Sequence, residues 1–297
     1  MSNIVHKDQK ALGIAIMLAA AFVLTATDAA VKWAVADYSV IQVNFFRGIF
    51  AILVLGPLLL RKEGFNALKT TRPTVHIVRS ALLIVVSFVW FYTLRFMKLA
   101  DAGALVMMAP IFITALSAPL LGERVGGFRW AAVLIGFFGM LFIVRPGTGV
   151  FQSVSLLAVL VALGYALFMI SNRAYRNSET LTALIIYPQI AVLLAATILV
   201  PWFWKTPTLA GFVVMAIAGL CAGLGHLLLT LAFRYAPPSI LAPLDYTALI
   251  WAIGMGYLFF SELPDRSSVA GMALITTAGL AIVFWEGVHR KTLVEDV

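Results

Sequence analysis

A few ionisable side chains lie deep inside long apolar runs, where a charge is costly unless it has a partner or a task. Asp28 and Arg47 lie at similar distances from the short polar segment near residue 38, and their opposite charges predict a pair. Such a pair can serve as a gate, or as a clamp for a carboxylate or an ammonium group. It can also be a structural ion pair, because burying either charge alone costs more than burying both.

Arg79, His226 and Asp245 form a second set, each at a similar distance from one end of its apolar run. We expect the three side chains at a common depth, because the runs holding His226 and Asp245 are antiparallel around a connection near residue 236. An imidazole beside a carboxylate can titrate near neutral pH. The set is therefore predicted to gate one end of a pathway and to sense protons or a substrate carboxylate. The structural alternatives are a snorkelling Arg79, a His226 bonded to a carbonyl and an Asp245 that caps a broken helix.

Polar and aromatic side chains elsewhere in the runs are candidates for lining a binding cavity. Such a site needs apolar surface with a few placed polar groups, and aromatic faces attract ammonium ions. The alternative for each residue is contact with lipid or with a neighbouring helix. Together with Arg47, the predicted substrate-binding residues are Asn44, Trp90, Tyr92, Phe112, Tyr165, Tyr187, Gln189, Tyr246 and Trp251. Asp28, Arg79, His226 and Asp245 are the predicted gating or coupling residues.

Composition identifies the elements that must position these residues. The apolar residues make up 62% of the chain and the charged residues 11%, against about 45–50% and 25% in soluble domains. The mean hydropathy is +1.01, which excludes a soluble enzyme, a disordered chain and a coiled coil. The runs are continuously apolar, which excludes a membrane β-barrel and predicts an all-α membrane protein. Ten runs are long enough to span a bilayer: 11–33, 40–60, 74–97, 99–121, 127–144, 151–171, 181–204, 208–233, 238–260 and 268–286.

The basic residues indicate the orientation of these spans. Lys and Arg are more numerous in the loops on the side of the N-terminus than in the opposite loops. This asymmetry predicts that both termini are cytoplasmic, in a bacterial inner membrane. The net charge of +8 is explained by these loops, and no basic face or stripe indicates nucleic acid as a partner.

Two segments of the chain resemble each other. Residues 109–123 read APIFITALSAPLLGE and residues 248–262 read ALIWAIGMGYLFFSE, a shift of 139 residues that also relates Arg95 to Arg234. Each half holds five spans, an odd number, so consecutive halves have opposite orientations. We therefore expect two inverted five-helix repeats, 1–148 and 149–297, with a site between them near the membrane midplane.

Small residues and helix ends have structural interpretations. The pattern Gly219-x-x-x-Gly223, together with Gly225, permits close helix packing. Pro110, Pro119 and Pro243 can break or kink their helices where freed carbonyls line a cavity. Glu123 and Glu262 end their helices and are expected to bond to the start of another helix.

The layout resembles the drug/metabolite transporter superfamily of the EamA type. The resemblance rests on the five-plus-five arrangement and on a helix that contains Pro110 and ends in Gly122-Glu123. The second half echoes this helix with an end at Ser261-Glu262. The resemblance covers roughly residues 10–287.

The resemblance implies a basket of ten helices, in which helices 1–4 and 6–9 surround a central cavity and helices 5 and 10 stand outside. It also implies export of small metabolites by alternating access, with exporters of neutral and aromatic amino acids as the nearest subgroup. Leu249 departs from the pattern, because it stands where the family often has the proline equivalent to Pro110. This leaves the break of the ninth helix open.

The function that these observations favour is secondary transport of a small molecule, with no cofactor or metal, by a monomer or homodimer in the bilayer. No G-x-x-x-x-G-K-[ST] motif is present, so ATP is not the direct energy source. No G-x-S-x-G motif supports an intramembrane hydrolase, and a channel is the other alternative. Neutral or aromatic amino acids are the expected substrates. A bulky organic cation such as a nucleoside-linked sulfonium is the main competitor, because Asp28 and Asp245 suit a cation.

Overall fold

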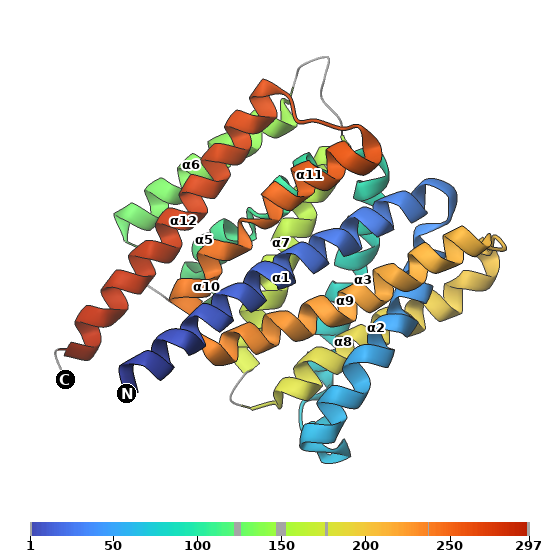
Figure 1. Cartoon of the computed structure of the whole chain (residues 1–297), viewed down its shortest axis with the longest axis horizontal. Helices are drawn as coiled ribbons and strands as arrows, with labels where there is room; N and C mark the ends of the chain where they lie inside the picture. Colours follow the sequence, from blue (N-terminus) through green and yellow to red (C-terminus); the bar gives the residue numbers. More distant parts are fainter. Residues whose placement is uncertain (1, 122–125, 147–152, 176–177, 237, 296–297) are drawn as a thin grey trace.

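A computed structural model describes residues 2–121, 126–146, 153–175, 178–236 and 238–295, and Figure 1 shows how their helices are arranged. No strand occurs in these ranges. The α-helices are α1 (Ser2–Asp37), α2 (Val40–Glu63), α3 (Pro73–Phe96), α4 (Leu99–Val106), α5 (Ala109–Leu121), α6 (Gly127–Val144), α7 (Val154–Tyr175), α8 (Leu181–Leu199), α9 (Leu209–Tyr235), α10 (Pro238–Asp245), α11 (Ala248–Phe260) and α12 (Arg266–Glu295). Two short 3₁₀-helices are η1 (Phe65–Leu68) and η2 (Val200–Phe203).

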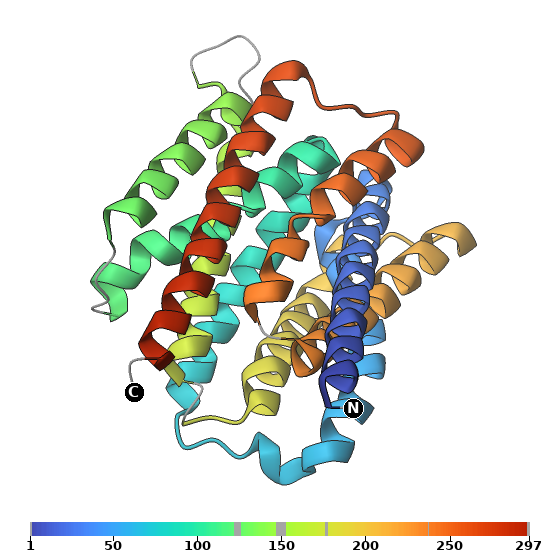
Figure 2. The same ribbon diagram turned by 60° about the vertical axis from the view of Figure 1, so that its left-hand side comes forward.

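The described residues contain 10 stretches that are long and apolar enough to cross a membrane. This confirms the ten predicted spans and the all-α membrane class. The first span extends from Lys10 to Asp37, beyond the predicted end at residue 33, because α1 is interrupted only at the Tyr38-Ser39 turn. Figures 1 and 2 show that α1 begins and α12 ends at the same end of the bundle, as an even number of spans requires.

The fourth and ninth spans are broken helices. The first break separates α4 from α5 at Met107-Met108, two residues before Pro110, whose ring removes one helical hydrogen bond. The second break separates α10 from α11 at Tyr246-Thr247. There the Leu249 N–H donates to the Tyr246 carbonyl at 3.2 Å, a tight turn that needs no proline at position 249.

The two breaks support the expected repeat. α4 and α10 each have 8 residues, and α5 and α11 each have 13. Leu99 and Pro238, the first residues of α4 and α10, are separated by the same 139 positions as the repeated segments. The division into halves at residues 148 and 149 remains a prediction, which this match supports.

The helices α6 and α12 lie side by side at one edge of the bundle (Figures 1 and 2). They approach closely because each has a glycine at the contact: a Cβ on Gly139 would lie 2.8 Å from the Gly271 carbonyl oxygen. The remaining spans pack against one another. This arrangement agrees with the expectation that the fifth and tenth spans stand outside.

Glycines on α9 let that helix pack tightly on α1 and α2. A Cβ on Gly219 would lie 2.7 Å from the Arg47 carbonyl oxygen, and a Cβ on Gly223 would lie 3.0 Å from that of Ala51. Gly225 faces Leu24, with its Cβ position 2.6 Å from a Leu24 methyl carbon. The predicted close packing is thus confirmed, and it brings α9 against the backbone that carries Arg47.

Candidate functional site

A cluster of polar and aromatic side chains lies on the inner faces of α1, α2, α3 and α9. It is here called the central group and consists of Asp28, Arg47, Trp90, Phe91 and His226. The Trp90 indole N–H donates to the Asp28 carboxylate at 2.9 Å. The Arg47 guanidinium carbon lies 5.1 Å from the centroid of the Phe91 ring. His226 is close enough to Arg47 for the two side chains to interact electrostatically.

The predicted pair of Asp28 and Arg47 does not form a direct salt bridge. Among the described residues, no salt bridge within 4.0 Å joins the two side chains. They still attract each other over a longer distance. The spacing of the two residues from their loop predicted a similar depth. In the structure, however, Asp28 accepts a hydrogen bond from the Trp90 indole, and the Arg47 guanidinium lies over the Phe91 ring.

Arg47 is the unusual member of this group. The Arg47 residue is only 9% exposed, and its Nε has no hydrogen-bond partner among the described residues. Within the described part of the chain, neither a hydrogen bond nor an ion pair satisfies the guanidinium. A buried cation without an anion is costly in an apolar environment. The arrangement therefore offers Arg47 as a ready site for the anionic group of a ligand.

Tyr165 and Asp245 form a second inward-facing pair. The Tyr165 residue is 38% exposed, although it lies on the same face of α7 as Ala158 and Ala162, which are both 0% exposed. The opposite face of α7 carries the exposed Leu160 and suits lipid. Tyr165 therefore faces solvent-accessible space inside the bundle, where it interacts electrostatically with the exposed Asp245 at the end of α10.

The predicted cluster of Arg79, His226 and Asp245 does not form. Arg79 donates to the Leu184 carbonyl at 3.0 Å and to the Ser171 hydroxyl, and thus joins α3 to α7 and α8. No hydrogen bond or ion pair between described residues links any two of the predicted three. Their distances from the helix ends predicted a common depth but not the rotation of each helix, which turns Arg79 towards α7 and α8.

Three other predicted binding residues have structural partners. The Asn44 carboxamide accepts a hydrogen bond from the Ser87 hydroxyl at 2.8 Å and joins α2 to α3. The Tyr187 hydroxyl donates to the Leu68 carbonyl at 2.5 Å. Tyr246 points at α12, where its hydroxyl oxygen would lie 1.5 Å from a Cβ on Gly279.

Tyr92 and Trp251 lie on exposed helix faces. Tyr92 is 44% exposed and packs beside Phe96, and Trp251 is 37% exposed and packs edge-on against Phe22. Trp251 shares its face of α11 with Leu258, which is 74% exposed. In a bilayer these apolar faces suit lipid, so the two rings do not contribute to the central group.

The last two predicted binding residues have no clear place in the site. Phe112 is partly buried and packs against the main hydrophobic core. Gln189 is half-buried on α8, and no hydrogen bond of its side chain is found within the described residues. Nothing in the structure distinguishes either side chain as a ligand contact.

Sequence reasoning missed a polar network at the end of the bundle where α1 and α3 finish, here called the Lys32 end. The Lys32 ammonium pairs with the Glu262 carboxylate at 3.0 Å and donates to the Met97 carbonyl at 2.5 Å. Glu262 also accepts a hydrogen bond from the Leu99 N–H at 3.2 Å, at the start of α4. This agrees with the expectation that Glu262 bonds a helix start, whereas Glu123 lies outside the described residues. Lys32 follows Asp28 by four residues on the same face of α1, which indicates that Lys32 faces inwards but does not identify Glu262 as its partner.

A second missed network lies at the opposite end, here called the His76 end. The His76 imidazole and the Glu179 carboxylate are 3.1 Å apart. The ring of Tyr187 lies 4.6 Å from the imidazole, between centroids. The hydrogen bond with His76 lowers the pKa of the Glu179 carboxyl below its usual value. The network joins α3 to the segment that precedes α8.

Comparison with known proteins identifies the family. Residues 11–145 match the EamA-like transporter family. The S-adenosylmethionine uptake transporter of Rickettsia bellii is 31% identical over 82% of this chain and 84% of its own length. The pseudopaline exporter of Pseudomonas aeruginosa is 30% identical, over 91% and 95%. The riboflavin transporter of Rhizobium johnstonii is 32% identical, over 80% and 79%.

The fold is also found in a solved structure. One crystal structure of a protein with 18% sequence identity superposes with a TM-score of 0.63, over 92% of this chain and 96% of that one. At this identity the likeness shows a shared fold alone. With the ten spans and the relatives, the conclusion is that the chain belongs to the EamA-like transporter family of the drug/metabolite transporter superfamily, as a multi-pass membrane transporter of small metabolites.

Proposed function

We propose that the protein is a secondary transporter of a small metabolite with an amino-acid head group, and that S-adenosylmethionine is its first candidate substrate. The observation that carries this proposal is the buried Arg47 guanidinium without an anionic partner. A carboxylate is the natural partner of such a guanidinium. The relatives from Rickettsia, named as S-adenosylmethionine uptake transporters, support the choice.

The central group suits both poles of this substrate. Arg47 takes the carboxylate, and Asp28 supplies a negative charge for the ammonium group. The ring of Trp90 offers a face that attracts cations such as the ammonium and the sulfonium. Tyr165 and Asp245 give a second polar and aromatic patch for the remainder of the molecule. Neutral and aromatic amino acids, the substrates expected from the sequence, carry the same head group and enter the same test.

The proposed mechanism is alternating access between the Lys32 end and the His76 end. The Lys32 network ties α1 and α3 to the segment after α11, and the His76 network ties α3 to the segment before α8. Opening one network while the other stays closed exposes the centre to one side at a time. The broken spans α4–α5 and α10–α11 supply points where helices can bend. The basic loops support a cytoplasmic position for both termini, with the Lys32 end facing outwards.

Counterflow in proteoliposomes tests the substrate and detects movement in either direction. The vesicles are loaded in turn with S-adenosylmethionine, phenylalanine, riboflavin and 5′-methylthioadenosine, which lacks the amino-acid head group. We expect exchange of the solutes with the head group and none of 5′-methylthioadenosine. Equal exchange of 5′-methylthioadenosine would show that the carboxylate is not recognised.

Substitution of Arg47 tests the residue. Arg47→Gln should lower the exchange rate about 30-fold or more, since a hydrogen bond to a charged group contributes roughly 2 kcal/mol. The matched control is Arg266→Gln, an exposed arginine at the Lys32 end. Because the guanidinium loses only its contact with the Phe91 ring and the longer-range attraction of Asp28, the melting temperature should fall little. Wild-type exchange by Arg47→Gln would exclude this role.

A further inference from the structure

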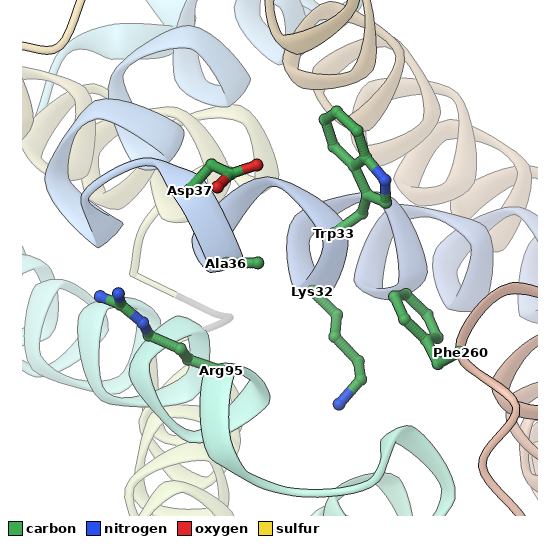
Figure 3. Close-up of a pocket in the computed structure, with 6 residues that line it drawn as sticks. All are labelled: Lys32, Trp33, Ala36, Asp37, Arg95 and Phe260. Atoms are coloured by element: carbon green, nitrogen blue, oxygen red, sulfur yellow. The ribbon is translucent and has the colours of Figure 1, made fainter.

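A cavity of about 310 Å³ opens at the Lys32 end, and its walls come from three helices. Figure 3 shows Lys32 and Phe260 to the right, Arg95 to the left and Ala36 on α1 between them. α1 contributes Lys32, Trp33, Ala36 and Asp37, α3 contributes Arg95 and α11 contributes Phe260. The cavity therefore combines two aromatic rings with charges of both signs.

Two of these charges, on Asp37 and Arg95, are held differently from the charge on Lys32. Among the described residues, neither the Asp37 carboxylate nor the Arg95 guanidinium takes part in an ion pair or a side-chain hydrogen bond. Asp37 accepts a bond from Lys205 only through its backbone carbonyl, at 3.0 Å. Arg95 contacts the Phe96 ring, 5.9 Å from its centroid. Lys32, by contrast, is fully occupied by Glu262 and two carbonyls.

The cavity lies on the way to the centre of the bundle. Lys32 and Asp28 are four residues apart on one face of α1, so Asp28 lies about one helical turn further in. Lys32, which lines the cavity, therefore lies between the cavity and Asp28 along α1. A solute that rests in the cavity is one helical turn from Asp28 once the Lys32 network opens.

We propose that this cavity is an entry site, which binds the amino-acid head group of a zwitterionic solute before the Lys32 network opens. Arg95 takes the carboxylate, Asp37 takes the ammonium group, and Trp33 and Phe260 contact the adjoining apolar atoms. Its volume is at the lower end of the range of roughly 300–1,000 Å³ for ligand pockets. It therefore accommodates a head group with a short side chain. The identity of the solute class rests on the proposed function.

Tryptophan fluorescence tests binding separately from transport. Purified protein is titrated with phenylalanine, methionine and S-adenosylmethionine, and the signal of a Trp33→Phe variant is subtracted to isolate Trp33. The titration is made in the wild type and in Arg47→Gln, in which the central group is disabled. We expect a saturable Trp33 signal in both, weakened about five- to tenfold by Arg95→Gln and by Asp37→Asn, in line with exposed charged contacts. Arg266→Gln should leave the signal unchanged.

Each outcome separates the two proposals. Absence of a Trp33 signal in the wild type, or one unchanged by Arg95→Gln and Asp37→Asn, would overturn the entry site whatever the transport result. A normal Trp33 signal without exchange of any zwitterion in vesicles would instead contradict the proposed function. In vesicles of known orientation, the half-saturation concentration should rise in Arg95→Gln only for solute added at the Lys32 end.

Discussion

The two ends of the bundle are closed by different chemistry. At the Lys32 end, an ammonium group pairs with Glu262 and also donates to backbone carbonyls at the end of α3. At the His76 end, an imidazole meets the Glu179 carboxylate, beside the ring of Tyr187. The Lys32 residue is 8% exposed and the Glu179 residue 7%, whereas the Glu262 side chain is 25% exposed, so the Lys32 pair is partly removed from bulk water.

The two networks differ in the cation that pairs with the carboxylate and in the number of segments that they join. The Lys32 ammonium has several donors, and its network joins four segments: α1, the end of α3, the segment after α11 and the start of α4. The first N–H of α4 donates to the Glu262 carboxylate. The His76 pair joins two segments, and it is an ion pair only when the imidazole is protonated. We therefore expect the Lys32 end to be the more sensitive to loss of one residue.

The largest effect is expected from Lys32→Met. The substitution leaves the Glu262 carboxylate and the Met97 carbonyl without their partner. Breaking a buried pair costs roughly 3 kcal/mol or more, and the 25% exposure of the Glu262 side chain lowers the cost here to about 2–3 kcal/mol. The melting temperature of the purified protein should fall further than in any other single variant proposed for the two ends. Lys98→Met is the matched control at the same end, because its ammonium makes one exposed hydrogen bond, to the Leu263 carbonyl.

A double variant distinguishes the lost pair from lost packing. Lys32→Met with Glu262→Gln no longer leaves an unpaired carboxylate, and the glutamine can still accept from the Leu99 N–H. It should therefore be more stable than Lys32→Met alone. Equal or lower stability of the double variant would contradict the ion-pair explanation.

A smaller effect is expected from Glu179→Gln at the His76 end. The amide still reaches the imidazole, so only the charged part of the bond is lost, about 1 kcal/mol. Because the pKa of Glu179 is lowered in the folded protein, its carboxylate stabilises the fold above the unfolded value of about 4.3. That stabilisation is lost as pH falls through the lower, folded value. Thermal melting should show a gap between wild type and variant at pH 7 that closes in acid. A gap that persists below both values would exclude this assignment.

The sequence predicted the spans well and the side-chain partners poorly. Continuous apolar runs located the ten spans, because bilayer thickness and backbone hydrogen bonding fix helix length. The break of the ninth span was left open, because Leu249 stands where a proline was expected. The scarcity of charges within spans drew attention to Asp28 and Arg47, and their role in binding stays a prediction. Their partners depend on helix rotation, which loop spacing does not contain, and so the indole of Trp90 replaced the expected guanidinium.

Two further errors have identifiable causes. Lys32 stands near the end of its apolar run, where a lysine resembles a loop charge, and only the tertiary structure brings Glu262 to it. Tyr92 was expected in the cavity on residue type alone. Its spacing from Val85, seven residues earlier on one helical face, indicates the exposed face on which both residues lie.

The smallest effect is expected from the exposed ion pair of Arg145 and Asp265 at the Lys32 end. Asp265 also accepts the Ser268 N–H at 2.9 Å at the start of α12. This hydrogen bond and the guanidinium lower the pKa of the Asp265 carboxyl. The charge therefore stabilises the fold above the unfolded value of about 3.9, and this is lost as pH falls through the folded value. The side chain is 47% exposed, so Asp265→Asn, which keeps the cap, should cost less than about 1 kcal/mol. Melting at pH 7 should show a small gap from wild type that shrinks with added salt and vanishes in acid. A gap as large as that of Lys32→Met would mean that burial does not separate the two pairs.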